Sequence, residues 1–151
     1  PKVLVLYDNS EFNLYRINLE LNMHTSEIDI YPILASITDQ LKLIDVLQAY
    51  KINTVFHAAA YKHVPMVEIN PLEGIRNNIL GTYACVKASM EAEVNNFILI
   101  STDKAVRPTN VMGATKRFSE LILQGADKLT KKTCFTICSA YHYNLSYDCS
   151  R

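Results

Sequence analysis

The chain has 151 residues, 49% of them apolar, and its 15 lysines and arginines balance 15 aspartates and glutamates. This composition predicts one folded domain and excludes a disordered chain. The balanced charge gives no footprint of a nucleic-acid-binding protein. The apolar runs fall far short of the ~20 residues that a membrane span needs, and no signal-peptide cleavage site follows the first run. We therefore expect a cytoplasmic protein without a membrane segment in this chain.

The cysteines do not follow a metal-binding pattern. They stand at positions 85, 134, 138 and 149, and none of their spacings is typical of a zinc site. Free thiols in a reducing compartment are the expected state. The sequence therefore predicts no metal site.

Short apolar runs alternate with helical patterns along most of the chain. The predicted strands cover residues 3–7, 28–34, 53–57, 96–100 and 133–138. The predicted helices cover residues 10–21, 39–51, 73–92 and 113–126. This alternation is typical of βαβ units, whose right-handed crossovers place helices on both faces of a parallel sheet. We predict an α/β protein with a Rossmann-like, doubly wound parallel sheet.

Glycine is scarce, with only four in the chain and no Gly-x-Gly-x-x-Gly cluster. A dinucleotide-binding domain places that cluster after its first strand and an acidic residue about 20 positions later. Asp8 closes the first apolar run, so we interpret it as this acidic residue, with a plain helix-capping role as the alternative. The expected sheet then lacks its first strand and its glycine-rich loop.

The most informative segment follows the strand predicted at 96–100. It reads Ser-Thr-Asp-Lys at 101–104, and Met-Gly-Ala-Thr-Lys follows at 112–116. Open α/β sheets place their chemistry at the carboxyl ends of their strands. One hydroxyl, one carboxylate and two amines there favour acid–base work on a small polar substrate. Taken alone, however, Asp103 and Lys104 could form an ordinary surface pair.

Several longer motifs carry a resemblance to a known family. They are Phe-His-Ala-Ala-Ala-Tyr-Lys-His-Val-Pro at 56–65, Asn-Pro-Leu-Glu at 70–73, Asn-Ile-Leu-Gly at 78–81, the stretch 101–117, and Asp-Asn-Ser-Glu-Phe at 8–12. Together they resemble the polysaccharide-biosynthesis branch of the extended short-chain dehydrogenases, over roughly residues 1–126. Its members are nucleotide-sugar 4,6-dehydratases that act on UDP-N-acetylglucosamine or close relatives in bacterial surface polysaccharide synthesis. They are often homo-oligomers, and full-length relatives can be anchored to the inner membrane.

The resemblance implies NAD as cofactor and a UDP-sugar as substrate. A hydride leaves C4 of the sugar for NAD and returns to C6 after water has been lost. Thr102 matches the residue that hydrogen-bonds the C4 oxygen, Asp103 the acid that protonates the departing C6 oxygen, and Lys104 the base that removes the C5 proton. These roles require a raised pKa for Asp103 and a lowered pKa for Lys104.

The resemblance also implies a set of binding residues. Lys116 matches the lysine at the nicotinamide ribose, and the Asp8 carboxylate would favour NAD over NADP. The small residues Ala58, Ala59 and Ala60 would let the backbone approach the cofactor. Lys62 and His63 on the following loop would meet the substrate.

Two positions depart from the wider superfamily. Most members carry tyrosine at position 112, one helical turn before Lys116, whereas Met112 cannot exchange a proton. The large membrane-anchored dehydratases carry methionine there, so Met112 narrows the subgroup. It leaves open whether Asp103, Lys104 or water deprotonates the C4 hydroxyl. Ser36 stands where relatives usually carry an aspartate near adenine.

The segment with which relatives continue after residue 137 is absent, and residues 139–151 are predicted to be irregular. We expect a partial NAD-binding domain over residues 1–138, a truncation or reading-frame change near 137, and no substrate domain. Three functions remain open. They are a 4,6-dehydratase domain, an epimerase of the same superfamily, and a non-catalytic remnant. Whether this chain is an active enzyme stays open as well.

Overall fold

The computed structural model describes residues 1–24 and 27–139, so the predicted irregular segment 140–151 lies outside the described residues. The elements are β1 (Val3–Asp8), α1 (Glu11–His24), β2 (Asp29–Leu34), α2 (Gln40–Ala49), β3 (Thr54–His57), α3 (Val64–Ile69), α4 (Pro71–Gly74), the π-helix η1 (Ile75–Leu80), α5 (Gly81–Glu91), β4 (Asn96–Ser101), the 3₁₀ helix η2 (Asp103–Ala105), α6 (Val111–Asp127) and β5 (Cys134–Ser139). Every predicted strand and helix is present, with ends displaced by a few residues. The sequence did not predict α3 or η2, nor that residues 75–80 within the predicted helix 73–92 form a π-helix.

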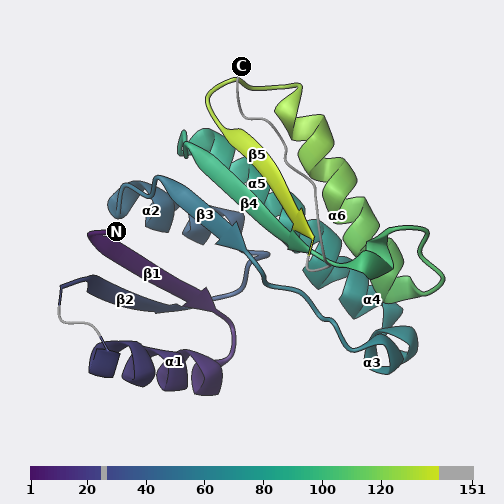
Figure 1. The fold of residues 1–151 in the computed structure, drawn as a ribbon, viewed down its shortest axis with the longest axis horizontal. Helices are drawn as coiled ribbons and strands as arrows, with labels where there is room; N and C mark the ends of the chain where they lie inside the picture. Colours follow the sequence, from purple (N-terminus) through teal and green to yellow (C-terminus); the bar gives the residue numbers. More distant parts are fainter. Residues whose placement is uncertain (25–26, 140–151) are drawn as a thin grey trace.

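The strands form two parallel sheets, β1–β2 and β3–β4–β5. The chain winds outward from β1 to β2, returns to β3, and then winds outward again to β4 and β5. Figure 1 shows the five strands running in the same general direction, with β1 and β3 as neighbours across the break. The described strands β1 and β3 share no ladder.

Helices cover both faces of the β1 strand. Tyr7 packs against the core that α2 and α5 build and also borders the pocket that Leu6 and Asp8 line with residues of α1. Because successive strand residues point to opposite faces, α1 and α2 lie on opposite sides of β1. The fold is therefore doubly wound, as predicted.

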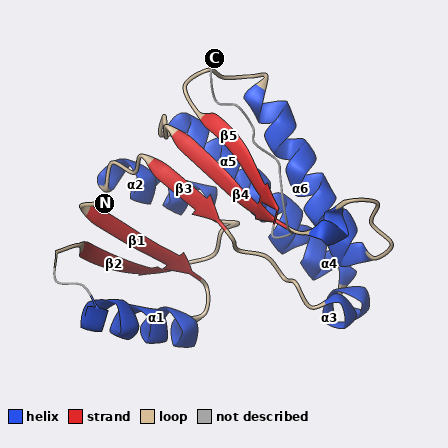
Figure 2. Cartoon of the chain, in the orientation of Figure 1, coloured by secondary structure: helices blue, strands red, loops and turns tan. Residues whose placement is uncertain are grey.

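The main core lies between the β3–β4–β5 sheet and the helices α2, α5 and α6, which Figure 2 shows along one face of these strands. Phe97 and Leu99 of β4 are 0% exposed, and Leu123 of α6 packs in the same cluster. This packing fixes the carboxyl end of β4 against α6. No helix in the described part of the chain is long and apolar enough to cross a membrane.

The start of α6 is held by polar partners. Asn110 Oδ1 accepts a hydrogen bond from Gly113 N at 2.7 Å, and Glu68 Oε1 accepts one from Val111 N at 2.6 Å. These contacts satisfy backbone donors that the first turn of a helix leaves unpaired. A Cβ atom at Gly113 would lie 2.3 Å from the Lys104 carbonyl oxygen, so glycine permits the close approach of α6 to η2.

Candidate active site

The polar segment after β4 forms a short turn at the carboxyl end of the sheet. Thr102 caps η2, and its Oγ1 accepts a hydrogen bond from Lys104 N at 3.4 Å. The same hydroxyl donates to Asp103 Oδ1 at 2.8 Å. The other oxygen of Asp103 has no hydrogen-bond partner among the described residues. The Thr102 hydroxyl and an Asp103 carboxylate with one oxygen unbonded within the described residues therefore lie together where the sequence predicted acid–base chemistry.

Lys116 of α6 contacts the same carboxyl end of β4. Its Nζ donates to the Ile100 carbonyl oxygen at 2.6 Å, and the residue is only 7% exposed. Burial lowers the pKa of Lys116, while the negative charge of Glu120 opposes that shift. Met112, one turn earlier, is 2% exposed and packs inside. The Lys116 amine thus contacts the backbone of Ile100, two residues before Thr102 in the chain.

Lys104 is placed differently from the other predicted residues. Its backbone packs against Gly113, whereas its side chain is exposed. In the described part of the chain no hydrogen bond or ion pair joins the side chains of Asp103, Lys104 and Lys116. The structure gathers the three residues at one end of β4 without direct contact between their charged groups.

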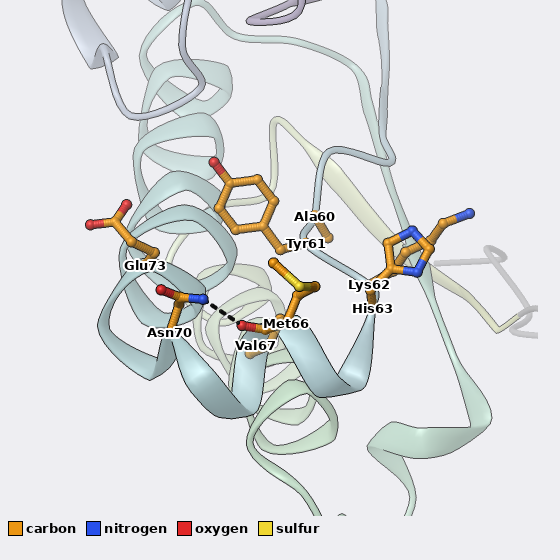
Figure 3. Close-up of a pocket in the computed structure, with 8 residues that line it drawn as sticks. All are labelled: Ala60, Tyr61, Lys62, His63, Met66, Val67, Asn70 and Glu73. Atoms are coloured by element: carbon orange, nitrogen blue, oxygen red, sulfur yellow. Dashed lines mark hydrogen bonds between the residues drawn. The ribbon is translucent and has the colours of Figure 1, made fainter.

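The loop after β3 borders a pocket of about 420 Å³. Ala60, Lys62 and His63 line it, together with Tyr61, Met66, Val67, Asn70 and Glu73. Figure 3 shows Lys62 and His63 grouped at one end of this pocket, with Glu73 at the other. Ala58 is exposed and Ala59 half-buried on the strand side of the same loop. The candidate substrate residues therefore sit on a concave, largely apolar surface, as ligand pockets commonly do.

Asn78 joins this loop to α6. Its side chain accepts from Tyr61 N at 2.7 Å and donates to Tyr61 O at 3.0 Å and to Thr115 Oγ1 at 2.9 Å. It lies in η1, and π-helical turns occur frequently at functional sites. Thr115 directly precedes Lys116, so one buried amide aligns the loop with the lysine. The sequence pointed to Asn78 only through the family resemblance and gave no signal for Thr115.

His57 continues this buried polar layer. Its Nε2 lies 2.9 Å from Thr82 Oγ1, which itself donates to Asn78 O at 2.6 Å. Burial and the nearby Lys116 lower the pKa of His57 to about 4. The ring is therefore neutral near pH 7 and acts as a hydrogen-bonded core residue.

Asp8 closes β1 in a second pocket, of about 290 Å³, lined by Leu6, Tyr7, Asp8, Asn13, Leu14 and Ile17. Its Oδ1 accepts a hydrogen bond from Ser10 N at 2.7 Å. Ser10 Oγ accepts from Asn13 N at 3.3 Å, so Ser10 caps α1 directly and Asp8 holds the residue that does so. In the described part of the chain the second oxygen of Asp8 has no partner, which leaves it able to accept a hydrogen bond from a ligand.

Sequence reasoning missed a charged group beneath the site. Glu120 Oε1 accepts from Ser101 Oγ at 2.6 Å, and Glu120 Oε2 pairs with Arg117 Nη1 at 2.8 Å. Glu120 stands four residues after Lys116 on the same helix. That spacing places the two side chains on one face and was the available signal.

Two sets of strands wind in opposite directions from one break, and polar residues follow the strands on each side of it. Ligands bind at such a switch point in open α/β sheets. The fold and the site therefore define a doubly wound α/β protein of the nucleotide-binding type.

Residues 1–144 match the family of polysaccharide biosynthesis proteins, and the chain belongs to this family. The family resemblance seen in the sequence is thereby confirmed. The chain is 43% identical over 136 residues to the capsular polysaccharide biosynthesis protein CapD of Staphylococcus aureus, a match that covers 89% of this chain and 23% of that protein. It is 32% identical over 139 residues to a UDP-N-acetylglucosamine 4,6-dehydratase (inverting) of Campylobacter jejuni, covering 91% and 40%.

Among solved structures, the chain is similar to Pen from Bacillus thuringiensis, with a TM-score of 0.82 and 31% sequence identity. That likeness covers 92% of this chain and 42% of the other. The chain therefore spans less than half the length of these relatives.

Proposed function

We propose that this chain carries the cofactor-binding part, over residues 1–138, of a nucleotide-sugar 4,6-dehydratase in surface polysaccharide synthesis. The substrate is a UDP-sugar of the UDP-N-acetylglucosamine type. The observation that carries the proposal is the meeting of the Thr102–Asp103 pair with Lys116 at the carboxyl end of β4. The Campylobacter jejuni relative, a dehydratase by name, supports it.

The residues present fit the ribose ends of NAD. Asp8 keeps one carboxylate oxygen for a ribose hydroxyl, and Lys116 offers an amine donor. Ala58, Ala59 and Ala60 leave room for the cofactor beside the loop. When bound, NAD would supply a hydride acceptor for C4 and a hydride donor for C6 of the sugar. A carrier of this kind suits a reaction that oxidises one carbon and reduces another without net oxidation.

The protein residues would carry the loss of water. Thr102 would orient the C4 oxygen through its hydroxyl. The exposed Lys104 amine would take the C5 proton as the C5–C6 double bond forms and the C6–O bond breaks. Asp103 would give its proton to the departing C6 oxygen, so water leaves. Lys62 and His63 would contact the substrate at the pocket beside the loop.

The test combines calorimetry with product analysis. The chain is titrated with NAD and then incubated with NAD and UDP-N-acetylglucosamine, and the products are read by mass spectrometry. Loss of one water, abolished by Asp103→Asn and retained by the exposed-site control Glu91→Gln, is the expected result. A product of unchanged mass with altered stereochemistry would indicate an epimerase. Absence of both NAD binding and product would contradict the proposal.

A further inference from the structure

Glu120 is a buried carboxylate that the proposed chemistry does not use. It is 7% exposed, yet both of its oxygens are paired, one with the Ser101 hydroxyl and one with the Arg117 guanidinium. A buried carboxylate is costly unless it is hydrogen-bonded and charge-paired. Its presence under the site therefore calls for a role.

Glu120 and Lys116 hold neighbouring residues of one strand. Lys116 Nζ donates to the Ile100 carbonyl at 2.6 Å, and Glu120 Oε1 accepts from the hydroxyl of the next residue, Ser101, at 2.6 Å. The two helical residues are one turn apart, so both contacts are made from one face of α6. The strand directly continues into Thr102 and the candidate acid.

We propose that Glu120 is a positioning residue that keeps Lys116 protonated and directed at the end of β4. The amine then remains a cationic donor for a ribose or a developing negative charge, although it is almost fully buried. The ribose role rests on the proposed function. The coupling between Glu120 and Lys116 rests on their one-turn spacing on α6 and on the hydrogen bonds that both make to the end of β4.

The charged groups around Lys116 differ in how they affect the protonation of its amine. Burial lowers the pKa of Lys116, and the negative charge of Glu120 raises it. His57 in β3 is neutral near pH 7, and the half-exposed Arg117 adds a competing positive charge that Glu120 partly neutralises. On neighbouring elements, Glu68 of α3 bonds the start of α6, while Asp103 and Lys104 lie in η2.

The experiment follows the Lys116 side chain by NMR in protein labelled at lysine, with Lys116→Met to assign the signal. Glu120→Gln removes the negative charge with little change in shape. We expect the titration midpoint of Lys116 to fall, several-fold more than in the control Asp127→Asn, which removes one exposed carboxylate from the same helix. Equal changes in the two variants would overturn the proposal.

Arg117→Met is a second variant, which should shift the titration midpoint of Lys116 in the opposite direction. The arginine side chain is 46% exposed, so its loss is compatible with folding even where Glu120→Gln is not. Removal of this cation leaves Glu120 to act on Lys116 alone, and the midpoint of Lys116 should rise. An unchanged or lowered midpoint contradicts the proposal.

Calorimetry with NAD on the same proteins separates the two proposals. Shifted midpoints without NAD binding by the wild-type chain would support the Glu120–Lys116 coupling and contradict the proposed function. NAD binding with unshifted midpoints would support the function and contradict the coupling.

Discussion

The part of the chain around β3, β4, β5, α2, α5 and α6 is packed far more tightly than the part formed by β1, α1 and β2. In the first part, Phe97 and Leu99 are fully buried. In the second, α1 buries only Leu14, and Phe12 remains 67% exposed. The strand β1 is only half-buried along its length although it is nearly all apolar. Apolar sequence predicts a strand in both parts, but burial depends on the neighbours that cover it.

This difference divides the candidate site. Thr102, Asp103 and Lys116 stand on the well-packed part, where partly buried polar contacts hold them. Asp8 stands on the thinly packed part. Regions with few buried apolar contacts open at lower free energy than the core. A ligand that bridges Asp8 and Lys116 would therefore stabilise the β1–α1–β2 part most.

The largest expected effect is the loss of a core ring. Phe97→Ala should lower the free energy of unfolding by about 3–5 kcal/mol, because it leaves a cavity among fully buried neighbours. Phe12→Ala removes the same ring from an exposed position of α1 and should cost no more than about 0.5 kcal/mol. Urea denaturation followed by circular dichroism measures both. Similar losses in the two variants would refute the division of the molecule into tightly and thinly packed parts.

The second effect is a pH dependence centred in the well-packed part. The pKa of buried His57 is lowered from 6.5 to about 4, so the unfolded chain binds a proton that the folded chain does not between these values. Stability from this group is complete above about pH 6.5 and falls as the pH drops toward 4, by roughly 3 kcal/mol in all. Denaturation curves from pH 7 to pH 4 measure the slope.

His57→Gln serves as the control for that slope, since it keeps a polar side chain that does not titrate. The variant should be less stable than wild type at pH 7 and show a smaller loss toward pH 4. A slope as steep as that of wild type would assign the pH dependence to other groups.

The third effect tests the contact between α6 and η2. Gly113→Ala places a Cβ 2.3 Å from the Lys104 carbonyl oxygen and should cost about 1–3 kcal/mol, since backbone must shift. Gly125→Ala on the same helix meets no atom within 4 Å and should be neutral or stabilise the protein by up to about 1 kcal/mol. Thermal unfolding compares the two. A Gly113→Ala protein as stable as Gly125→Ala would contradict the close approach.

The sequence was sufficient for elements with a strong apolar pattern and insufficient for contacts between them. The run before Ser101 was found because it is continuously apolar, and the Lys116 helix because its apolar residues repeat with a helical period. The short helix α3 was missed, since it has only six residues and begins next to a proline. The π-helix around Asn78 and the Ser101–Glu120 bond depend on tertiary packing, which periodicity does not encode. Asp8 was placed correctly at a strand end, but only the structure showed that Ser10 does the capping.

The smallest expected effect tests whether the thinly packed β1–α1–β2 part contributes to the cofactor site. Asp8→Asn keeps the acceptor that Ser10 N uses and removes the charge offered to a ribose hydroxyl, so it should weaken NAD binding by about 0.5–1.5 kcal/mol. Asp29→Asn makes the same charge change on an exposed residue at the opposite end of the β1–β2 pair and should leave binding unchanged. Calorimetry reads both affinities. Equal affinities would remove Asp8 from the site and leave Lys116 and its neighbours on β4 and α6 as the cofactor contacts to test.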